Sequence, residues 1–138
     1  MCTLRIYGDN LNVEALLDLL TIEPAAVYRR GELKFKSTGR CWLTSGVNIG
    51  VSDAGFANLS EQITDACAFI EEHKGELTAL RSLPGVEHVD FDFPVEELDV
   101  TIPSYRFPAV LIKLLASIGA ELEVSLYPAA KEDSPPPL

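Results

Sequence analysis

The sequence contains few cysteines, and their number and spacing exclude the common cysteine frameworks. Three cysteines occur among the 138 residues, namely Cys2, Cys41 and Cys67. Their count is odd and no C-x-x-C pair occurs, which excludes the thiolate-pair motif of zinc ribbons and dithiol redox enzymes. We therefore expect free thiols, and a reducing cytoplasm is the simplest environment for them.

Long apolar runs and a secretory leader are also missing. No run approaches the roughly 20 apolar residues that a membrane-spanning helix needs. The first residues, MCTLRIYGDN, lead directly into a strand pattern and lack the basic start and apolar stretch of a signal peptide. We expect a cytoplasmic protein without a membrane segment.

Positive charge is scarce in this chain. The sequence has 11 Lys and Arg residues against 21 Asp and Glu residues, which gives a formal net charge of −10. Repulsion by phosphate groups then opposes binding to nucleic acids and to anionic membranes. The same balance is compatible with a basic protein partner, and equally with solubility alone.

Familiar catalytic motifs are absent from the sequence. It has no G-x-S-x-G, no H-E-x-x-H and no phosphate-binding loop ending in Gly-Lys-Ser/Thr, and it has two histidines in all. We predict no cofactor. The absences favour a protein without catalytic activity over an enzyme.

The spacing of apolar residues predicts a single domain over residues 1–127. Alternation indicates strands, and recurrence every three or four residues indicates helices. The expected strands are 3–7, two or three short strands within 26–44, 86–95, 98–102 and 121–127. The expected helices are 13–20, 59–74 with Gly75 as its stop, 77–83 and 109–118. Asn12 is expected to cap the first of these, and Asn58 with Glu61 has capping-box-like spacing at the start of the second. Residues 45–58 are expected to form a long loop, although Val47, Ile49 and Val51 could extend the preceding strand. The proline-rich tail 128–138 is expected to be disordered.

This order of elements predicts an α+β fold. Strict alternation in the last strands indicates a sheet that is packed on one face and solvated on the other. The helix at 109–118 is apolar on nearly every side, so we expect it between the sheet and a neighbouring helix. We predict a mostly antiparallel sheet with helices packed on one face, in the manner of a ferredoxin-like sandwich.

Three stretches of the chain carry a resemblance to a known family. They are LRIYGDNLNVEALLDLLTIEPAAVYRRGE, GRCWLTSG and LIKLLASIGAELEVSLY. Together with the long helix after Asn58, they make residues 3–127 resemble a bacterial family known as domain of unknown function 4279. The resemblance implies a small stand-alone bacterial domain. It implies no activity, and no catalytic residue can be transferred from it.

The first candidate site is the triplet His88, Asp90 and Asp92. Alternate residues of a strand project from one face, so an imidazole and two carboxylates would line up there. Such nitrogen and oxygen ligands suit a divalent metal ion. Glu121 and Glu123 would complete the set if their strand were a neighbour. The alternative is an ordinary solvated outer face of an antiparallel sheet.

The second candidate site lies in residues 29–40. This stretch holds five of the 11 basic residues and one acidic residue, Glu32, giving a local charge of +4 in an acidic protein. The basic residues are Arg29, Arg30, Lys34, Lys36 and Arg40, and Trp42 follows them. Arginine beside an aromatic ring suits a carboxylate, a phosphate or an acidic peptide. The alternative is that these charges protect an edge strand from pairing with other chains.

Three hypotheses about function follow. The leading one is a non-catalytic binding or interaction module, such as an immunity or inhibitor protein for a basic partner. The second is a domain that senses a small anionic ligand through Arg29, Arg30, Arg40 and Trp42. The third is a small hydrolase or metal-dependent enzyme that uses His88, Asp90 and Asp92. Exposed edge strands are also compatible with a homodimer.

Overall fold

The computed structural model describes residues 1–34 and 39–128. The strands are β1 (Thr3–Gly8), β2 (Ala26–Tyr28), β3 (Ser45–Gly50), β4 (His88–Glu96) and β5 (Glu121–Tyr127). The helices are α1 (Val13–Leu19), α2 (Leu59–Glu72), α3 (Lys74–Leu80) and α4 (Ala109–Ser117). Residues 35–38, which include Lys36, and 129–138 of the predicted tail lie outside the described residues. Within the described ranges, no helix has the length and apolar character needed to cross a membrane.

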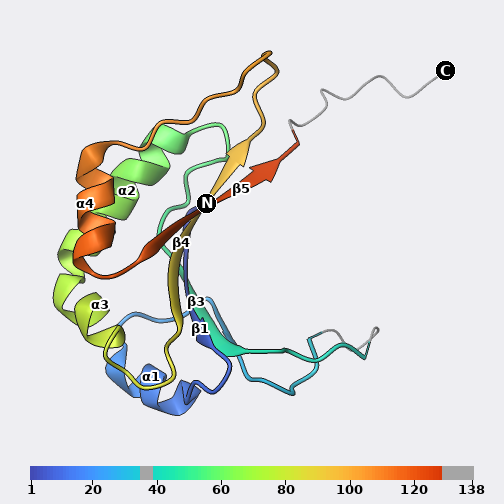
Figure 1. The fold of residues 1–138 in the computed structure, drawn as a ribbon, viewed down its shortest axis with the longest axis vertical. Coiled ribbons are helices and arrows are strands. Elements are labelled where there is room, and N and C mark those ends of the chain that lie inside the picture. Colours follow the sequence, from blue (N-terminus) through green and yellow to red (C-terminus); the bar gives the residue numbers. More distant parts are fainter. Residues whose placement is uncertain (35–38, 129–138) are drawn as a thin grey trace.

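The described strands form one sheet in the order β2-β3-β1-β4-β5 (Figure 1). Neighbouring strands run antiparallel except β4 and β5, which are parallel and are connected through α4. This arrangement confirms the predicted α+β fold and mostly antiparallel sheet, and it is compatible with a ferredoxin-like sandwich. Strands β2 and β5 are the two edges, and the homodimer stays a prediction.

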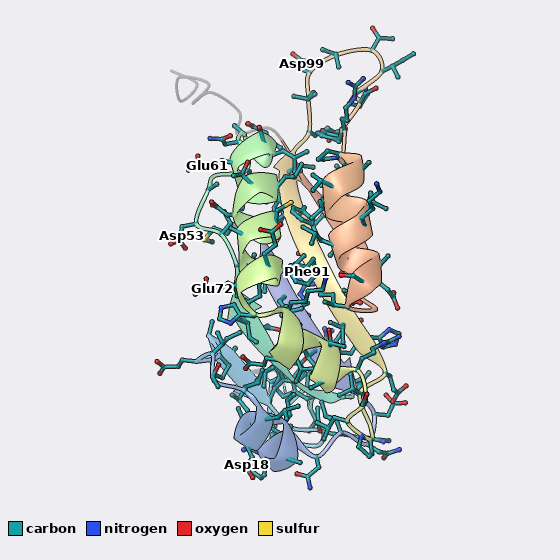
Figure 2. The ribbon with its side chains drawn as sticks, turned by 90° about the vertical axis from the view of Figure 1, so that its left-hand side faces the viewer. Asp18, Asp53, Glu61, Glu72, Phe91 and Asp99 are labelled. Atoms are coloured by element: carbon teal, nitrogen blue, oxygen red, sulfur yellow. The ribbon has the colours of Figure 1, made fainter. Side chains whose placement is uncertain are left out.

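All four labelled helices lie on one side of the sheet (Figure 1). The sheet presents alternate residues of each strand to them, including Leu4 and Ile6 of β1 and Phe91 and Phe93 of β4, which are all completely buried. Phe91 lies beneath the helix layer, where it meets the ring of Phe69 from α2 edge-on (Figure 2). Burial of this apolar face is the main favourable contribution to folding.

Asparagine side chains begin two of the helices. The Asn12 side chain accepts a hydrogen bond from the Ala15 amide at the start of α1, and Asn58 accepts one from the Glu61 amide at the start of α2. The Asn58 amide group also donates to the Glu61 carboxylate, so the predicted capping interaction is confirmed. The predicted stop at Gly75 is wrong, because α2 ends at Glu72 and Gly75 lies inside α3.

Several predicted strand boundaries are wrong. Residues 45–50 form β3, where the sequence predicted a loop in which Val47 and Ile49 could extend a strand. Of the short strands expected within 26–44, β2 is present, and the described residues that follow it form one isolated bridge, from Leu33 to Cys41. Residues 98–102 form no strand, and they cannot pair with β4 because it is already paired on both sides, with β1 and β5.

Helix α4 packs between the sheet and a neighbouring helix, as predicted. It contacts α2 and β5, and Leu111 and Leu115 are buried. Val110 and Ile112 are 54% and 48% exposed, because no described element covers the outer side of this helix. The apolar character of α4 on nearly every side therefore exceeds what its packing buries.

Gly46 allows two tyrosines to lie against β3. A Cβ atom added to Gly46 would lie 2.7 Å from both the Tyr28 hydroxyl and the Tyr7 Cβ, and closer still to the Ile6 carbonyl oxygen. We expect Gly46→Ala to lower the free energy of unfolding by about 1–3 kcal/mol, as overpacking does. Urea unfolding monitored by circular dichroism measures the effect.

Gly50 provides the matched control on the same strand. No described atom lies within 4 Å of a Cβ added there. Gly50→Ala should therefore leave stability unchanged or raise it by less than about 1 kcal/mol. Equal losses in the two variants would show that strand propensity, not contact with the tyrosines, sets the cost.

Candidate functional site

The sheet face opposite the helices carries a group of polar side chains. In each strand these residues alternate with the core residues, as the period of two requires. We call this surface the open face and define it by Arg5, Tyr7, His88, Asp90, Asp92, Glu121, Glu123 and Ser125. They come from β1, β4 and β5, which lie side by side in the sheet.

Asp92 is buried on the open face but has a partner for each carboxylate oxygen. Arg5 Nη2 donates to Oδ2 at 2.9 Å, and Ser125 Oγ donates to Oδ1 at 2.6 Å. The other terminal nitrogen of Arg5 lies 3.3 Å from the Glu123 carboxylate. A carboxylate that is 4% exposed is thus neutralised by a cation and fully hydrogen-bonded, which is the condition for tolerating a buried charge.

Asp90 is equally buried and less well satisfied. Its Oδ2 accepts a hydrogen bond from the Tyr7 hydroxyl at 2.9 Å. Its Oδ1 is buried and has no hydrogen-bond partner among the described residues. The residue is 5% exposed, so the expectation of a solvated face is wrong for Asp90, as it is for Asp92. Two side chains of β1 contact these carboxylates: Arg5 contacts Asp92, and Tyr7 contacts Asp90.

Tyr7 connects Asp90 to His88. Its ring stacks on the His88 imidazole with 4.8 Å between the centroids and 24° between the planes. Burial, followed by the hydrogen bond to Asp90, raises the pKa of Tyr7 to about 12. The hydroxyl therefore stays protonated at neutral pH and acts as a hydrogen-bond donor to Asp90.

His88, Asp90 and Glu121 converge at one end of the open face. One potential ligand atom from each of the three residues lies within 4.8 Å of the other two. His88 Nδ1 is 3.9 Å from the Glu121 carboxylate, which is brought beside Asp90 by the parallel register of β4 and β5. The structure thus groups His88 and Asp90 with Glu121, while Asp92 is held by Arg5 and Ser125.

The second predicted site is divided by the structure. Arg29 pairs with Glu14 and lies 3.8 Å from Glu32. Arg30 is exposed, and its backbone amide donates to Ser45. Arg40 and Trp42 do come together, in a separate hollow.

The hollow that contains Arg40 and Trp42 has a volume of about 520 Å³, and we call it the arm hollow. It is lined by Lys34, Arg40, Cys41, Trp42, Leu43 and Thr44. Trp42 stacks on Tyr28 with 4.2 Å between the centroids, and Lys34 Nζ lies 4.6 Å from the centre of the Trp42 ring. The arrangement places two cationic side chains around an aromatic surface.

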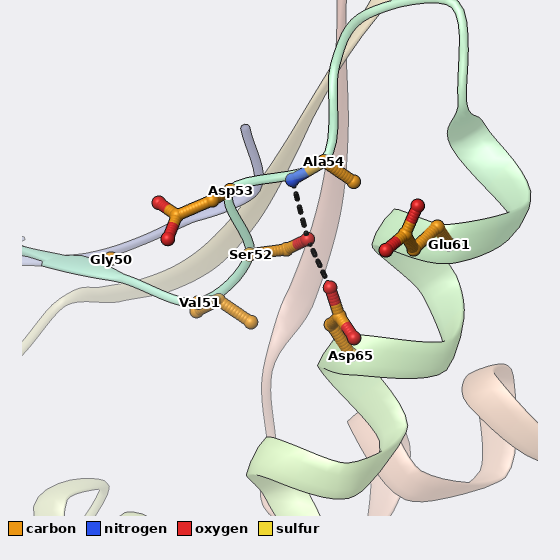
Figure 3. A pocket seen from close by; sticks show the side chains of 7 residues that line it. All are labelled: Gly50, Val51, Ser52, Asp53, Ala54, Glu61 and Asp65. Atoms are coloured by element: carbon orange, nitrogen blue, oxygen red, sulfur yellow. Dashed lines mark hydrogen bonds between the residues drawn. The ribbon is translucent and has the colours of Figure 1, made fainter.

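Another hollow, of about 550 Å³, lies between α2 and the loop that follows β3 (Figure 3). The Ser52 hydroxyl donates to Asp65 at 2.6 Å and accepts from the Ala54 amide at 3.2 Å (Figure 3). No histidine is among the described residues that line it, so this serine lacks the usual base of a nucleophile. Its hydrogen bonds fasten the loop to α2. No motif in the sequence indicated this hollow.

Two of the thiols are unsuited to nucleophilic chemistry. Burial raises the pKa of Cys2 to about 12 and also raises the pKa of Cys67. A reactive cysteine requires a lowered pKa, because the thiolate is the nucleophile. Both side chains remain protonated at neutral pH.

The fold and the open face define an α+β protein with a polar, partly buried surface on one side of its sheet. The chain belongs to the family described as Domain of unknown function (DUF4279), whose model matches residues 1–129. No curated protein and no solved structure matches the chain.

The Arg5–Asp92 pair generates a prediction about stability. Removing one member of a buried ion pair leaves an uncompensated charge, which costs about 3–5 kcal/mol when the pair is fully buried. Since 36% of the Arg5 side chain is exposed, water screens part of this effect. We expect Arg5→Ala to lower the free energy of unfolding by about 2–3 kcal/mol, measured by urea denaturation.

Two further variants separate charge from packing. In an Asp92→Asn background the cost of Arg5→Ala should fall to less than half, because the uncompensated charge is gone. Arg106→Ala removes an exposed arginine and should change stability by less than about 0.5 kcal/mol. An identical cost of Arg5→Ala in both backgrounds would mean that the arginine stem stabilises the sheet through packing alone.

Proposed function

We propose that this protein is a non-catalytic binding module and that its open face binds a basic segment of a partner protein. The observation that carries the proposal is the charge imbalance of this face. Among the described residues that define it, four carboxylates accompany a single guanidinium, that of Arg5. An immunity or inhibitor protein for a basic target would fit this description.

The two exposed glutamates would make the direct contacts. The side chains of Glu121 and Glu123 are 59% and 49% exposed, whereas Asp90 and Asp92 are buried. Asp92 is already neutralised by Arg5, so of the buried pair it is Asp90 that adds to the negative potential. The glutamates on edge strand β5 are within reach of a lysine or arginine. Complementary potentials of this kind accelerate association and exclude partners of the wrong charge.

A charge-reversal experiment tests the proposal. The purified chain is immobilised, incubated with lysate of its native cell and washed at rising salt, and bound proteins are identified by mass spectrometry. We expect a basic protein whose retention falls as salt rises, because screening weakens charge contacts. The Glu121→Lys/Glu123→Lys variant should retain at least about tenfold less of it.

The matched control places the same charge change among the helices. Glu71 and Glu72 are exposed at the end of α2, where Figure 2 labels Glu72. The Glu71→Lys/Glu72→Lys variant has the same net charge as the open-face variant and should retain the partner like the original protein. Equal losses in both variants would contradict a specific role of the open face, and the absence of any captured partner would contradict the binding module itself.

A second candidate function is supported by the arm hollow. Lys34, Arg40 and Trp42 surround a space large enough for a small anion, and arginine beside an aromatic ring suits a carboxylate or phosphate. We infer that an anion-sensing site would lie in the arm hollow. Arg29 contributes less to such a site, since two glutamates already neutralise it.

Trp42 provides the measurement for this candidate. It is the single tryptophan of the sequence, so a titration with inorganic phosphate or citrate should change its fluorescence if the anion binds in the arm hollow. Arg40→Ala should weaken binding by about tenfold or more, the value of one charge-assisted hydrogen bond. Arg30→Ala is the control, because Arg30 does not line the hollow. Unchanged fluorescence with both anions would contradict the candidate.

A further inference from the structure

The geometry points to a divalent metal site formed by His88, Asp90 and Glu121. We propose that these residues bind one first-row transition ion, for which Zn²⁺ is the natural probe. One ligand atom from each already lies within 4.8 Å of the others. The inference is independent of the proposed function, since it concerns the purified chain alone.

Asp90 provides the observation that separates this group from an ordinary acidic surface. The residue is 5% exposed, and its Oδ1 has no hydrogen-bond partner among the described residues. A buried carboxylate oxygen without a partner is costly. A cation bound to this oxygen would remove the cost, because it would take the place of the absent hydrogen-bond donor.

The required rearrangement is small. In a tetrahedral site with metal–ligand bonds of about 2.0–2.2 Å, neighbouring ligand atoms lie about 3.4 Å apart. His88 Nδ1 and the Glu121 carboxylate are already 3.9 Å apart, and their side chains are 45% and 59% exposed, so small rotations of these side chains suffice to close the remaining gap. Asp90 is held by Tyr7, and the same tyrosine stacks on the His88 ring. One ligand is thus fixed while two adjust around it.

The other carboxylates of the open face are committed elsewhere. Asp92 accepts hydrogen bonds from Arg5 and Ser125, and Glu123 lies beside the second Arg5 nitrogen. Among the described residues, no lysine or arginine pairs with Asp90 or Glu121, and the imidazole of His88 lies beside both. A site with one imidazole and two carboxylates suits ions such as Zn²⁺, and three protein ligands leave a coordination position for water or for a group on a partner.

Calorimetric titration with Zn²⁺ tests the inference on the purified full chain. We expect one ion per chain, with binding that weakens as the pH is lowered because protons compete for the imidazole nitrogen. His88→Gln and Glu121→Gln should each weaken binding by at least about tenfold, since they remove ligands and not only supporting groups. Both residues are exposed on the outer part of the face, so these variants should fold, which circular dichroism checks.

The chain contains matched controls for both variants. His73 lies 3.9 Å from Glu72 and 3.8 Å from Glu76, but Glu76 is hydrogen-bonded to Thr21. Glu123 lies on the same strand and face as Glu121. His73→Gln and Glu123→Gln should therefore bind Zn²⁺ like the original chain.

Several results would overturn the inference. They are an absence of Zn²⁺ binding, binding that survives His88→Gln, and binding that is lost in His73→Gln instead. Loss of the ¹H–¹⁵N signals of the His88 imidazole at their free position on adding Zn²⁺, with those of His73 unchanged, would support the site directly. Partner capture is a separate assay with the Glu121→Lys/Glu123→Lys variant. A chain that binds Zn²⁺ but captures no partner would contradict only the proposed function. A chain that captures a partner but binds no Zn²⁺ would contradict only the metal site.

Discussion

The ion pair between Arg5 and Asp92 is the interaction on which the open face depends. Asp92 lies in β4, next to β1 in the middle of the sheet, and it is buried without contact to the helices' apolar layer. Arg5 neutralises it from β1, and Ser125 completes its hydrogen bonds from β5. Three strands are thereby joined through one carboxylate, and without the guanidinium the sheet would hold an uncompensated charge.

The same pair determines how charge is distributed over the rest of the face. Arg5 pairs with Asp92 and Glu123, so its positive charge compensates the carboxylates in one half of the surface. Asp90 and Glu121 form the other half with His88 and Tyr7. The two ends of this surface therefore differ. The Asp92 end is satisfied internally, whereas the Asp90 end has a buried carboxylate oxygen without a hydrogen-bond partner among the described residues. A metal ion or a basic side chain from a partner would satisfy it.

The sequence predicted part of this surface. Alternation placed His88, Asp90 and Asp92 on one face of a strand, and Glu121 was proposed as a neighbour on the condition that its strand lay alongside, which β5 satisfies. Arg5 and Tyr7 were missed, because an arginine and a tyrosine alternating with core residues are typical of any half-buried strand. Residues 45–50 were expected mainly as a loop, because Gly46 and Gly50 weaken the strand pattern, and pairing with β1 and β2 makes the extended alternative the correct one.

Features that depend on a few neighbouring residues could be predicted from the sequence. These are the apolar periodicity of most helices and strands and the asparagine caps at Asn12 and Asn58. The strand order, the burial of Asp90 and Asp92, and the position of Glu121 in place of Asp92 beside His88 became evident from the folded chain. The reason is physical: periodicity and capping act within one or two turns of the chain, whereas the environment of a charge depends on which distant strands become its neighbours when the core packs.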